Sequence, residues 1–200
     1  MKNIVVGITG ASGSIYGLRL VEELLRAEKQ VTVLLTNAGR QVTEFETGLA
    51  FAENPLKCLD QLKKYFKVDS SLEYYALNNF FAPVASGSSA PDAVVICPCS
   101  MGTLGRIAAG LSDNLLERVA DVALKEQKKL LLVPRETPFN QIHLENLLSL
   151  SKAGAQILPA MPGFYQRPAS VDDLVNFVVG KILDSLGIEH QLFLRWGGEE

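Results

Sequence analysis

A glycine-rich segment, GITGASGSIYG at residues 7–17, follows the first apolar run and precedes a stretch with helical spacing. Backbone amides at such a strand-to-helix turn can face an anion or the edge of a flavin, because glycine allows close approach and a helix N-terminus carries positive potential. The segment lacks the dinucleotide fingerprint G-x-G-x-x-G and the Gly-Lys-Ser/Thr ending of a Walker A loop. Glycines also serve simply to pack a helix on a strand, so the segment alone leaves both a ligand site and a structural loop open.

The end of the second predicted strand narrows the class of ligand. Dinucleotide enzymes usually place Asp or Glu there, against the ribose hydroxyls, whereas this chain has Thr36 and Asn37. Small hydroxyl and amide groups suit a phosphate better than an adenosine ribose. The residues therefore favour a mononucleotide such as FMN over NAD, with a sugar phosphate or a structural loop as alternatives.

The rest of the sequence predicts the scaffold that positions these residues. Short apolar runs rich in β-branched residues predict strands at 3–9, 31–36, 93–97, 130–134 and 156–159. Helical spacing predicts helices at 14–28, 39–49, 55–66, 103–109, 114–125, 137–153 and 170–186. This alternation is typical of βαβ units and a parallel sheet.

Several residues mark where the predicted helices begin and end. Asp113 and Ser170 are predicted to cap helices, and Gly154 and Gly187 to end them. Segments 71–90 and 161–168 fit neither strand nor helix. We expect them to be connections at the sheet edge, where ligands bind to this class of fold.

Length and composition indicate the class of protein. A chain of 200 residues predicts a single domain over 1–200. Hydrophobic residues make up 48% and charged residues 20%, below the usual ~25%, so we expect part of the apolar surface to meet other subunits. A net charge of −3 with scattered basic residues argues against nucleic-acid binding, which needs a clustered basic surface.

Neither a membrane segment nor a metal site is expected. The chain has no apolar run of about 18 residues and no signal-peptide cleavage site, so we expect a cytoplasmic protein. Cys58, Cys97 and Cys99 lack the spacing of a zinc site or disulfide framework and are predicted to be reduced, packed thiols. His143 and His190 are expected on a helix surface and in C-terminal packing, with no Ser/His/Asp triad.

Five stretches carry a resemblance to a known family. They are ITGASGSIYGLRL at 8–20, ASGSSAPDAVVICPCSMGTLGRIAAG at 85–110, DNLLERVADVALKE at 113–126, LLLVPRETPFNQIHLENLLSL at 130–150 and PAMPGFYQRPASVDDLVNFVVGKILDSLGI at 159–188. VPRETP, CPCS and PGFY in this order are much more specific than a glycine loop. The chain resembles the UbiX family of flavin prenyltransferases, which implies a Rossmann-like three-layer α/β/α flavoprotein fold shared with cysteine decarboxylases.

The resemblance implies an FMN site between subunits of a large homo-oligomer, a dodecamer built from trimers. The matching positions are Gly10, Ala11, Ser12, Thr36, Asn37, Ser100, Thr103 and Arg118. Thr36 and Arg118 are the implied ligands of the flavin phosphate. The alternative for Arg118 is a solvated helix arginine paired with Glu117 or Asp121.

The resemblance also implies a site for the donor, dimethylallyl monophosphate. Its phosphate is matched by Lys125, Arg135, Tyr165 and Lys181, a clamp suited to the charge that grows as the C–O bond breaks. Lys181 stands where the family commonly has arginine, and it keeps the charge without the two-pronged geometry.

The prenyl pocket and the acid–base groups complete the implied site. Phe80, where relatives have tryptophan, would shield an allylic cation beside Ser86 and Gly87, or else belong to the core. Glu136 would hydrogen-bond the phosphate or relay its proton, unless it is only a charge at a helix N-terminus. Ser12 and Glu46 would assist around flavin N5 and C4a.

The implied reaction joins the dimethylallyl group to N5 and C6 of reduced FMN, without oxidising the flavin. The prenylated FMN would serve a UbiD-type decarboxylase, with ubiquinone biosynthesis as the usual pathway. An FMN-dependent aromatic-acid or cysteine-type decarboxylase is the main alternative, although the cysteine enzymes use a histidine after the second strand and this chain has none there. A carrier that only delivers flavin is a further alternative, but it would not need a second phosphate clamp.

Overall fold

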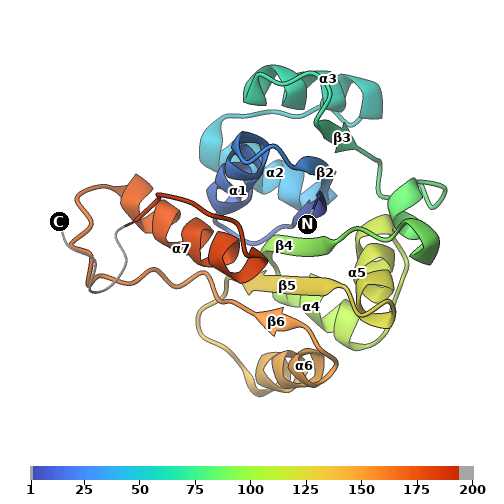
Figure 1. Ribbon diagram of the computed structural model, residues 1–200. Helices are drawn as coiled ribbons and strands as arrows, with labels where there is room; N and C mark the ends of the chain where they lie inside the picture. Colours follow the sequence, from blue (N-terminus) through green and yellow to red (C-terminus); the bar gives the residue numbers. More distant parts are fainter. Residues whose placement is uncertain (1, 194–200) are drawn as a thin grey trace.

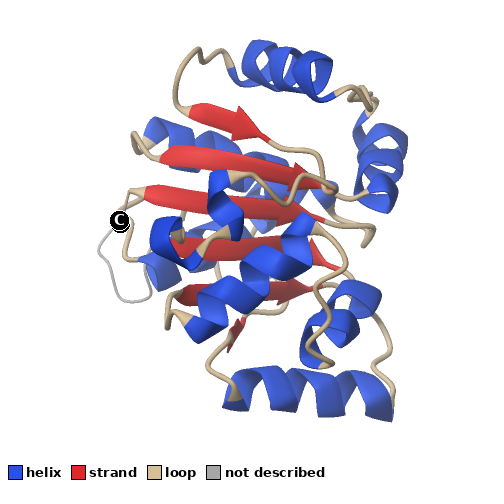
Figure 2. Ribbon diagram, turned by 90° about the vertical axis from the view of Figure 1, so that its right-hand side faces the viewer, coloured by secondary structure: helices blue, strands red, loops and turns tan. Residues whose placement is uncertain are grey.

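The computed structural model describes residues 2–193, which contain one six-stranded sheet between two layers of helices (Figure 1). The strands are β1 (Asn3–Ile8), β2 (Gln30–Leu35), β3 (Leu72–Tyr74), β4 (Ala93–Cys99), β5 (Lys129–Pro134) and β6 (Gln156–Ile157). Every pairing is parallel, in the order β3-β2-β1-β4-β5-β6, and all the strands point the same way (Figure 2). The predicted Rossmann-like α/β fold is confirmed; residue 1 and residues 194–200 of the predicted domain lie outside the described residues.

Two strand predictions need correction. Segment 71–90, predicted as a connection, contains β3, a three-residue edge strand too short to give a periodic signal. It also contains two 3₁₀ turns, η1 (Pro83–Ala85) and η2 (Gly87–Ser89). Strand β6 covers only half of the predicted 156–159, and Pro159 has no N–H with which to extend the ladder.

The helices are α1 (Ser14–Arg26), α2 (Asn37–Thr47), α3 (Pro55–Phe66), α4 (Met101–Ala108), α5 (Leu115–Lys125), α6 (Gln141–Lys152) and α7 (Val171–Leu186). Their caps explain where the predicted bounds were wrong. Helices α2 and α4 begin two residues early because Thr36 and Ser100 accept hydrogen bonds from the amides of Gly39 and Thr103. Helix α6 begins four residues late, after its cap Asn140. Within residues 2–193, no helix is long and apolar enough to cross a membrane.

Other cap predictions had mixed outcomes. Ser170 caps α7 and Gly187 ends it in the left-handed conformation, as predicted. The cap of α5 is Asn114 rather than Asp113, because the Asn114 side chain accepts from the amide of Glu117. Helix α6 ends at Lys152, and Gly154 follows with a φ of 104°.

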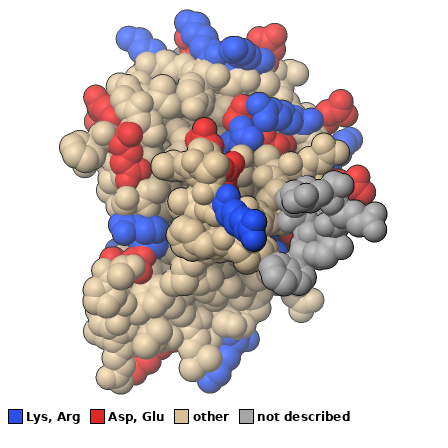
Figure 3. Space-filling view, turned by 90° about the vertical axis from the view of Figure 1, so that its left-hand side faces the viewer, with Lys and Arg blue, Asp and Glu red and all other residues tan. Residues whose placement is uncertain are grey.

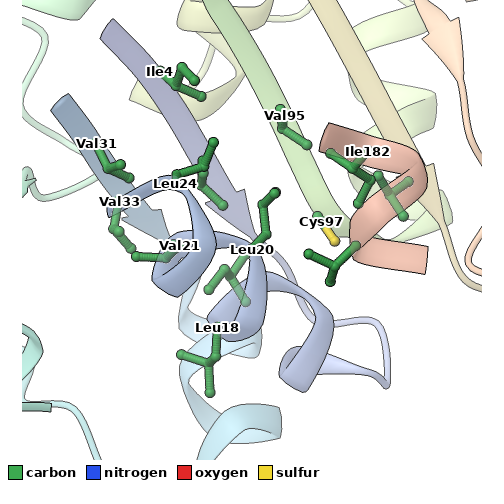
Figure 4. Close-up of a cluster of buried hydrophobic side chains, with 14 of the residues drawn as sticks. Ile4, Leu18, Leu20, Val21, Leu24, Val31, Val33, Val95, Cys97 and Ile182 are labelled. Atoms are coloured by element: carbon green, nitrogen blue, oxygen red, sulfur yellow. The ribbon is translucent and has the colours of Figure 1, made fainter. Parts of the chain in front are cut away.

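The core lies on both faces of the sheet, because alternate residues of each buried strand point to opposite sides. Ile4 and Val6 of β1 belong to the cluster that packs with α1 and α7. Figure 4 shows Ile4 on this side of the core, with Leu24 of α1 and Ile182 of α7. Val5 belongs to the other cluster, with α4 and α5. The three cysteines are free and buried, which confirms their prediction as packed thiols.

The strand order predicts a ligand site between the carboxyl ends of β1 and β4, and we call this position the crevice. The chain leaves β1 toward β2 in one direction and enters β5 from β4 in the other, so the strand order reverses between β1 and β4. Ligands of open parallel sheets bind at the carboxyl ends of strands at such a reversal. The loops after β1, β2, β4 and β5 all end at this carboxyl edge.

Candidate active site

Hydrogen bonds tie together the loops at the carboxyl edge. The amide of Thr36 donates to Ile8 O over 3.1 Å, and the amide of Arg135 donates to Cys99 O over 3.3 Å. Between them, Thr9 Oγ1 donates to Pro98 O over 2.7 Å. These bonds fix the residues that follow β2, β1, β4 and β5 along a single line.

Thr9 was not among the predicted site residues, although it joins the two sides of the crevice. Its side chain is fully buried, and its Oγ1 also accepts from the amide of Ser100 over 2.8 Å. Ser100 Oγ in turn donates to Thr103 Oγ1 over 3.1 Å. The structure thus brings the predicted pair Ser100 and Thr103 together; the available sequence signal for Thr9 was a hydroxyl directly after an apolar strand.

The glycine-rich loop lies closely against the neighbouring loop. A Cβ on Gly10 would come within 2.5 Å of Ala38 Cβ, next to Asn37, and one on Gly17 within 2.3 Å of Cys97 O. Glycine is therefore required at both positions for the loop after β1 to reach α2 and for α1 to pack on β4. The predicted residues Gly10 and Ala11 thus lie beside the start of α2.

The N-terminus of α1 faces an anion that belongs to the protein itself. Glu46 accepts from the amide of Gly13 over 3.0 Å, and from the amide and hydroxyl of Ser14 over 2.9 and 2.8 Å. The amides of Gly13 and Ser14 therefore hold a side-chain carboxylate and not a ligand anion, while the other expectation for this loop, that it faces the edge of a flavin, stays a prediction. The predicted residues Ser12 and Glu46 do lie together, since Ser12 also hydrogen-bonds this carboxylate.

The protonation of Glu46 is set by two opposed effects. Partial burial raises the pKa of the carboxyl, but hydrogen bonds from Ser12, Ser14 and Gly13 outweigh it, so the pKa lies below its usual value. The ionised carboxylate therefore links α2 to the start of α1.

Replacing Glu46 with glutamine is expected to destabilise the protein in a pH-dependent way. The folded state has the lower pKa, so the stabilisation is present above the usual pKa of glutamate and is lost as the pH falls through the lowered pKa. The melting temperature of Glu46→Gln should lie below that of the wild type at neutral pH, and the two should converge in acid. A constant difference at every pH would contradict this explanation.

Arg135 carries the most unusual feature of the carboxyl edge. Its Nε is buried and has no hydrogen-bond partner among residues 2–193. Tyr16, in the first turn of α1, lies close enough to interact electrostatically: burial and Cys97 raise the pKa of the phenol, and Arg135 opposes them. A buried guanidinium nitrogen without a partner is costly, and an anionic ligand would satisfy it.

Glu136 lies beside Arg135, half-buried, and its Oε1 accepts from the amide of Thr137 over 3.0 Å. Because α6 begins only at Gln141, the alternative of a charge at a helix N-terminus is wrong. The carboxylate next to Arg135 stays a predicted acid–base group.

A second group of predicted residues lies on α5, at the right of Figure 1. Arg118 Nε donates to Ala85 O over 3.2 Å, and its Nη1 pairs with Asp121 at 2.8 Å, as the alternative interpretation expected. Lys125 pairs with Glu126, and a Cβ on Gly87 would come within 2.8 Å of Lys125 Nζ. We call this group the α5 surface; it comprises Ser86, Gly87, Arg118 and Lys125, and Phe80 of the preceding loop is assigned to it from the resemblance alone.

A third group lies on α7, at the left of Figure 1. The ring of Tyr165 meets that of Phe177 edge-on, with centroids 5.6 Å apart. Lys181 Nζ lies 5.7 Å from the centroid of the same Phe177 ring. The predicted pair Tyr165 and Lys181 therefore flanks one buried aromatic side chain.

One chain does not bring Lys125 of its α5 surface and Arg135 of its carboxyl edge together. Lys125 precedes β5 and Arg135 follows it, so the whole strand Lys129–Pro134 lies between them. At ~3.3 Å per residue, this strand separates the two cations by about 20 Å. A single small phosphate cannot contact both cations within one chain.

The two buried cysteines at the end of β4 are expected to be unreactive. Burial raises the pKa of the Cys99 thiol to about 12, and it also raises that of Cys97. Thiolate chemistry is therefore disfavoured here. Among residues 2–193, no three His, Cys, Asp or Glu side chains cluster as a metal site would require.

Comparison with known proteins identifies the family. The model of the Flavoprotein family matches residues 1–183. A curated relative from Halalkalibacterium halodurans, "Flavin prenyltransferase UbiX", is 55% identical over 97% of this chain and 93% of its own length. The chain belongs to the UbiX family.

Two solved structures of UbiX-type proteins share the fold. AnUbiX (PadA1), in complex with FMN and dimethylallyl pyrophosphate, has a TM-score of 0.89 and 35% identity, covering 100% of this chain and 99% of that one. A dodecameric FMN-dependent Ubix-like decarboxylase from Escherichia coli O157:H7 has a TM-score of 0.87 and 37% identity, covering 98% and 100%. Both agree with the flavoprotein fold predicted from the sequence.

Proposed function

We propose that this protein is a flavin prenyltransferase, which joins the dimethylallyl group of dimethylallyl monophosphate to N5 and C6 of reduced FMN. Family membership over nearly the whole chain supports the activity. The observation that carries the site is the buried Nε of Arg135 at the carboxyl edge, which has no hydrogen-bond partner in the described part of the chain, residues 2–193. An alkyl phosphate is an anion of the size that such a nitrogen could bind.

The residues of this chain fit a bound FMN. The flavin supplies the nucleophilic atoms when bound, and the protein has to hold it and exclude water. Gly10 allows the loop after β1 to lie against α2, while Ser100 and Thr103, whose hydroxyls bond each other at the start of α4, are proposed to contact the flavin from the β4 side. Thr36 and Asn37 lie at the N-terminus of α2, where positive potential suits the flavin phosphate, and Arg118 is its second proposed ligand.

The donor phosphate would be held by cations from separate segments. Arg135, Lys125 and Lys181 would stabilise the negative charge that grows on the leaving oxygen, since fixed cations in a dry site are effective there. Tyr165 would donate a hydrogen bond, and Glu136 would move a proton to or from the departing phosphate. Phe80 is 44% exposed in this chain and so is available to face an allylic carbon, beside Ser86 and Gly87.

We place the complete site between copies of the chain, where the α5 surface of one meets the carboxyl edge of another. Exposed apolar side chains support assembly: Phe81 is 100% exposed and Phe45 91%. Broad areas of the side bearing α7 carry no charged groups (Figure 3). The E. coli relative is dodecameric, and we propose the same assembly of trimers here.

The product, prenylated FMN, would pass to a UbiD-type decarboxylase in the cytoplasm, with ubiquinone biosynthesis as the pathway. Decarboxylation by this chain itself is the competing function, because the E. coli relative bears that name. The two functions predict different products from the same incubation.

Anaerobic incubation with reduced FMN and dimethylallyl monophosphate is expected to add one C5 unit to the flavin, as read by mass spectrometry. Dimethylallyl diphosphate in a parallel reaction tests the choice of donor, and oxidised FMN is the control that should stay unmodified. Unmodified flavin, together with carbon dioxide released from an aromatic acid, would contradict the proposal.

A further inference from the structure

The segment after α7 folds back onto that helix through a buried histidine. His190 is 2% exposed in its side chain, and its Nε2 lies 3.2 Å from Asp184 Oδ1. The amide of Leu192 donates to His190 Nδ1, also over 3.2 Å. Because Nδ1 accepts this bond, Nε2 carries the proton and donates to Asp184. The imidazole thus fixes residues 188–193 against the second half of α7.

Residues 188–193 can pack on α7 only because position 180 is a glycine. A Cβ on Gly180 would come within 2.4 Å of Phe193 Cε1 and within 2.7 Å of His190 Cε1. Both rings therefore lie directly on the backbone of α7. The His190 and Phe193 rings also contact each other, with centroids 5.0 Å apart.

Residues 188–193 also bring a second aromatic ring to Lys181. We call the rings of Phe177 and Phe193 beside its ammonium group the aromatic seat. The Phe193 and Phe177 rings lie 5.4 Å apart between centroids, tilted by 32°. Lys181 Nζ is 5.3 Å from the Phe193 centroid and 5.7 Å from that of Phe177. Both distances are within the range of cation–π attraction. Lys181 also lines a groove of about 300 Å³ between α7 and residues 158–161, which leaves space for a ligand.

We propose that the C-terminal segment positions the donor-phosphate cation: His190 holds Phe193, and Phe193 with Phe177 seats the Lys181 ammonium. This inference depends on the proposed function, in which Lys181 binds the donor phosphate. Lysine is a flexible point charge without the planar fork that arginine would offer at this position. The aromatic faces restrict the ammonium without accepting its N–H groups in conventional hydrogen bonds, so the N–H groups stay available to phosphate oxygens.

Phe193→Leu removes the aromatic face but keeps an apolar side chain, whereas Phe193→Tyr keeps the face. With oxidised FMN bound, so that no transfer occurs, titration calorimetry should show dimethylallyl monophosphate binding about fivefold more weakly to Phe193→Leu, as loss of one cation–π contact would produce. Phe193→Tyr should bind like the wild type. FMN affinity and melting temperature should stay close to wild type in both.

A double-mutant cycle separates positioning from general packing. In a Lys181→Met background, Phe193→Leu should cause no further loss of donor affinity, because the two residues act as one unit. Additive losses, or equal losses for Phe193→Leu and Phe193→Tyr, would overturn the proposed seat. If the wild type binds the donor without transferring it to reduced FMN, the proposed function fails while the seat still stands or falls on the titrations.

Discussion

Arg135→Met is expected to lower the single-turnover rate of prenyl transfer by about 10²–10³-fold, the usual loss when one preorganised donor to a developing charge is removed. The Nε of Arg135 is buried without a partner among residues 2–193, so its role lies with a ligand. The transfer rate of Arg135→Lys should lie between those of the wild type and Arg135→Met, because lysine keeps the positive charge but lacks the two-pronged donor geometry of the guanidinium. The flavin mass after rapid quenching gives the rate.

Stability distinguishes this arginine from a structural one. Arg135 is half-buried and its Nε has no hydrogen-bond partner among residues 2–193, so Arg135→Met should leave the melting temperature at or above that of the wild type. Arg40 is the matched control. Its Nε is also buried without a partner among the described residues, but its Nη1 donates to Phe51 O and its Nη2 to Tyr74 Oη, each over 2.9 Å. Arg40→Met should melt earlier and, while folded, transfer at nearly the wild-type rate. Loss of stability in Arg135→Met with transfer intact would show that Arg135 is structural.

The scaffold could be predicted from sequence because its signals are local. Apolar runs marked five of the six strands, and side chains such as Ser170 marked helix starts. Errors arose where the signal was short, as in β3, or where an early cap such as Thr36 competed with the apolar pattern. His143 and His190 were predicted in helix-surface and packing roles. His143 completes the capping box of α6 with Asn140, and His190 holds the C-terminal segment on α7.

The arrangement of the site could be predicted only in part. The resemblance gives residue identities, but burial and distance depend on tertiary contacts that no local pattern encodes. Glu46 reaches the amides of Gly13 and Ser14 from another helix, and so occupies an end of the loop that seemed suited to a ligand. The length of β5 likewise separates Lys125 from Arg135, which the linear order of motifs does not reveal.

That separation predicts complementation between two inactive variants. Arg118→Ala damages the α5 surface and Arg135→Met damages the carboxyl edge, so each alone should be nearly inactive. Co-expressed in equal amounts with different tags and purified as mixed oligomers, they should recover activity. Each site in a closed ring would take its α5 surface from one copy and its carboxyl edge from the neighbouring copy. Each of these surfaces is intact in half of the copies, so about one site in four has both intact. The measurement is C5 addition to reduced FMN per bound flavin.

The control pairs two variants of the same surface, Arg118→Ala with Lys125→Ala. No copy in that mixture offers an intact α5 surface, so activity should stay at the level of the single variants. Recovery in the first mixture alone shows that the site is shared, because a site within one chain would carry a defect in every copy. No recovery in mixed oligomers that still bind FMN would place the site in a single chain, and the proposed roles of Arg118 and Lys125 would then have to be abandoned.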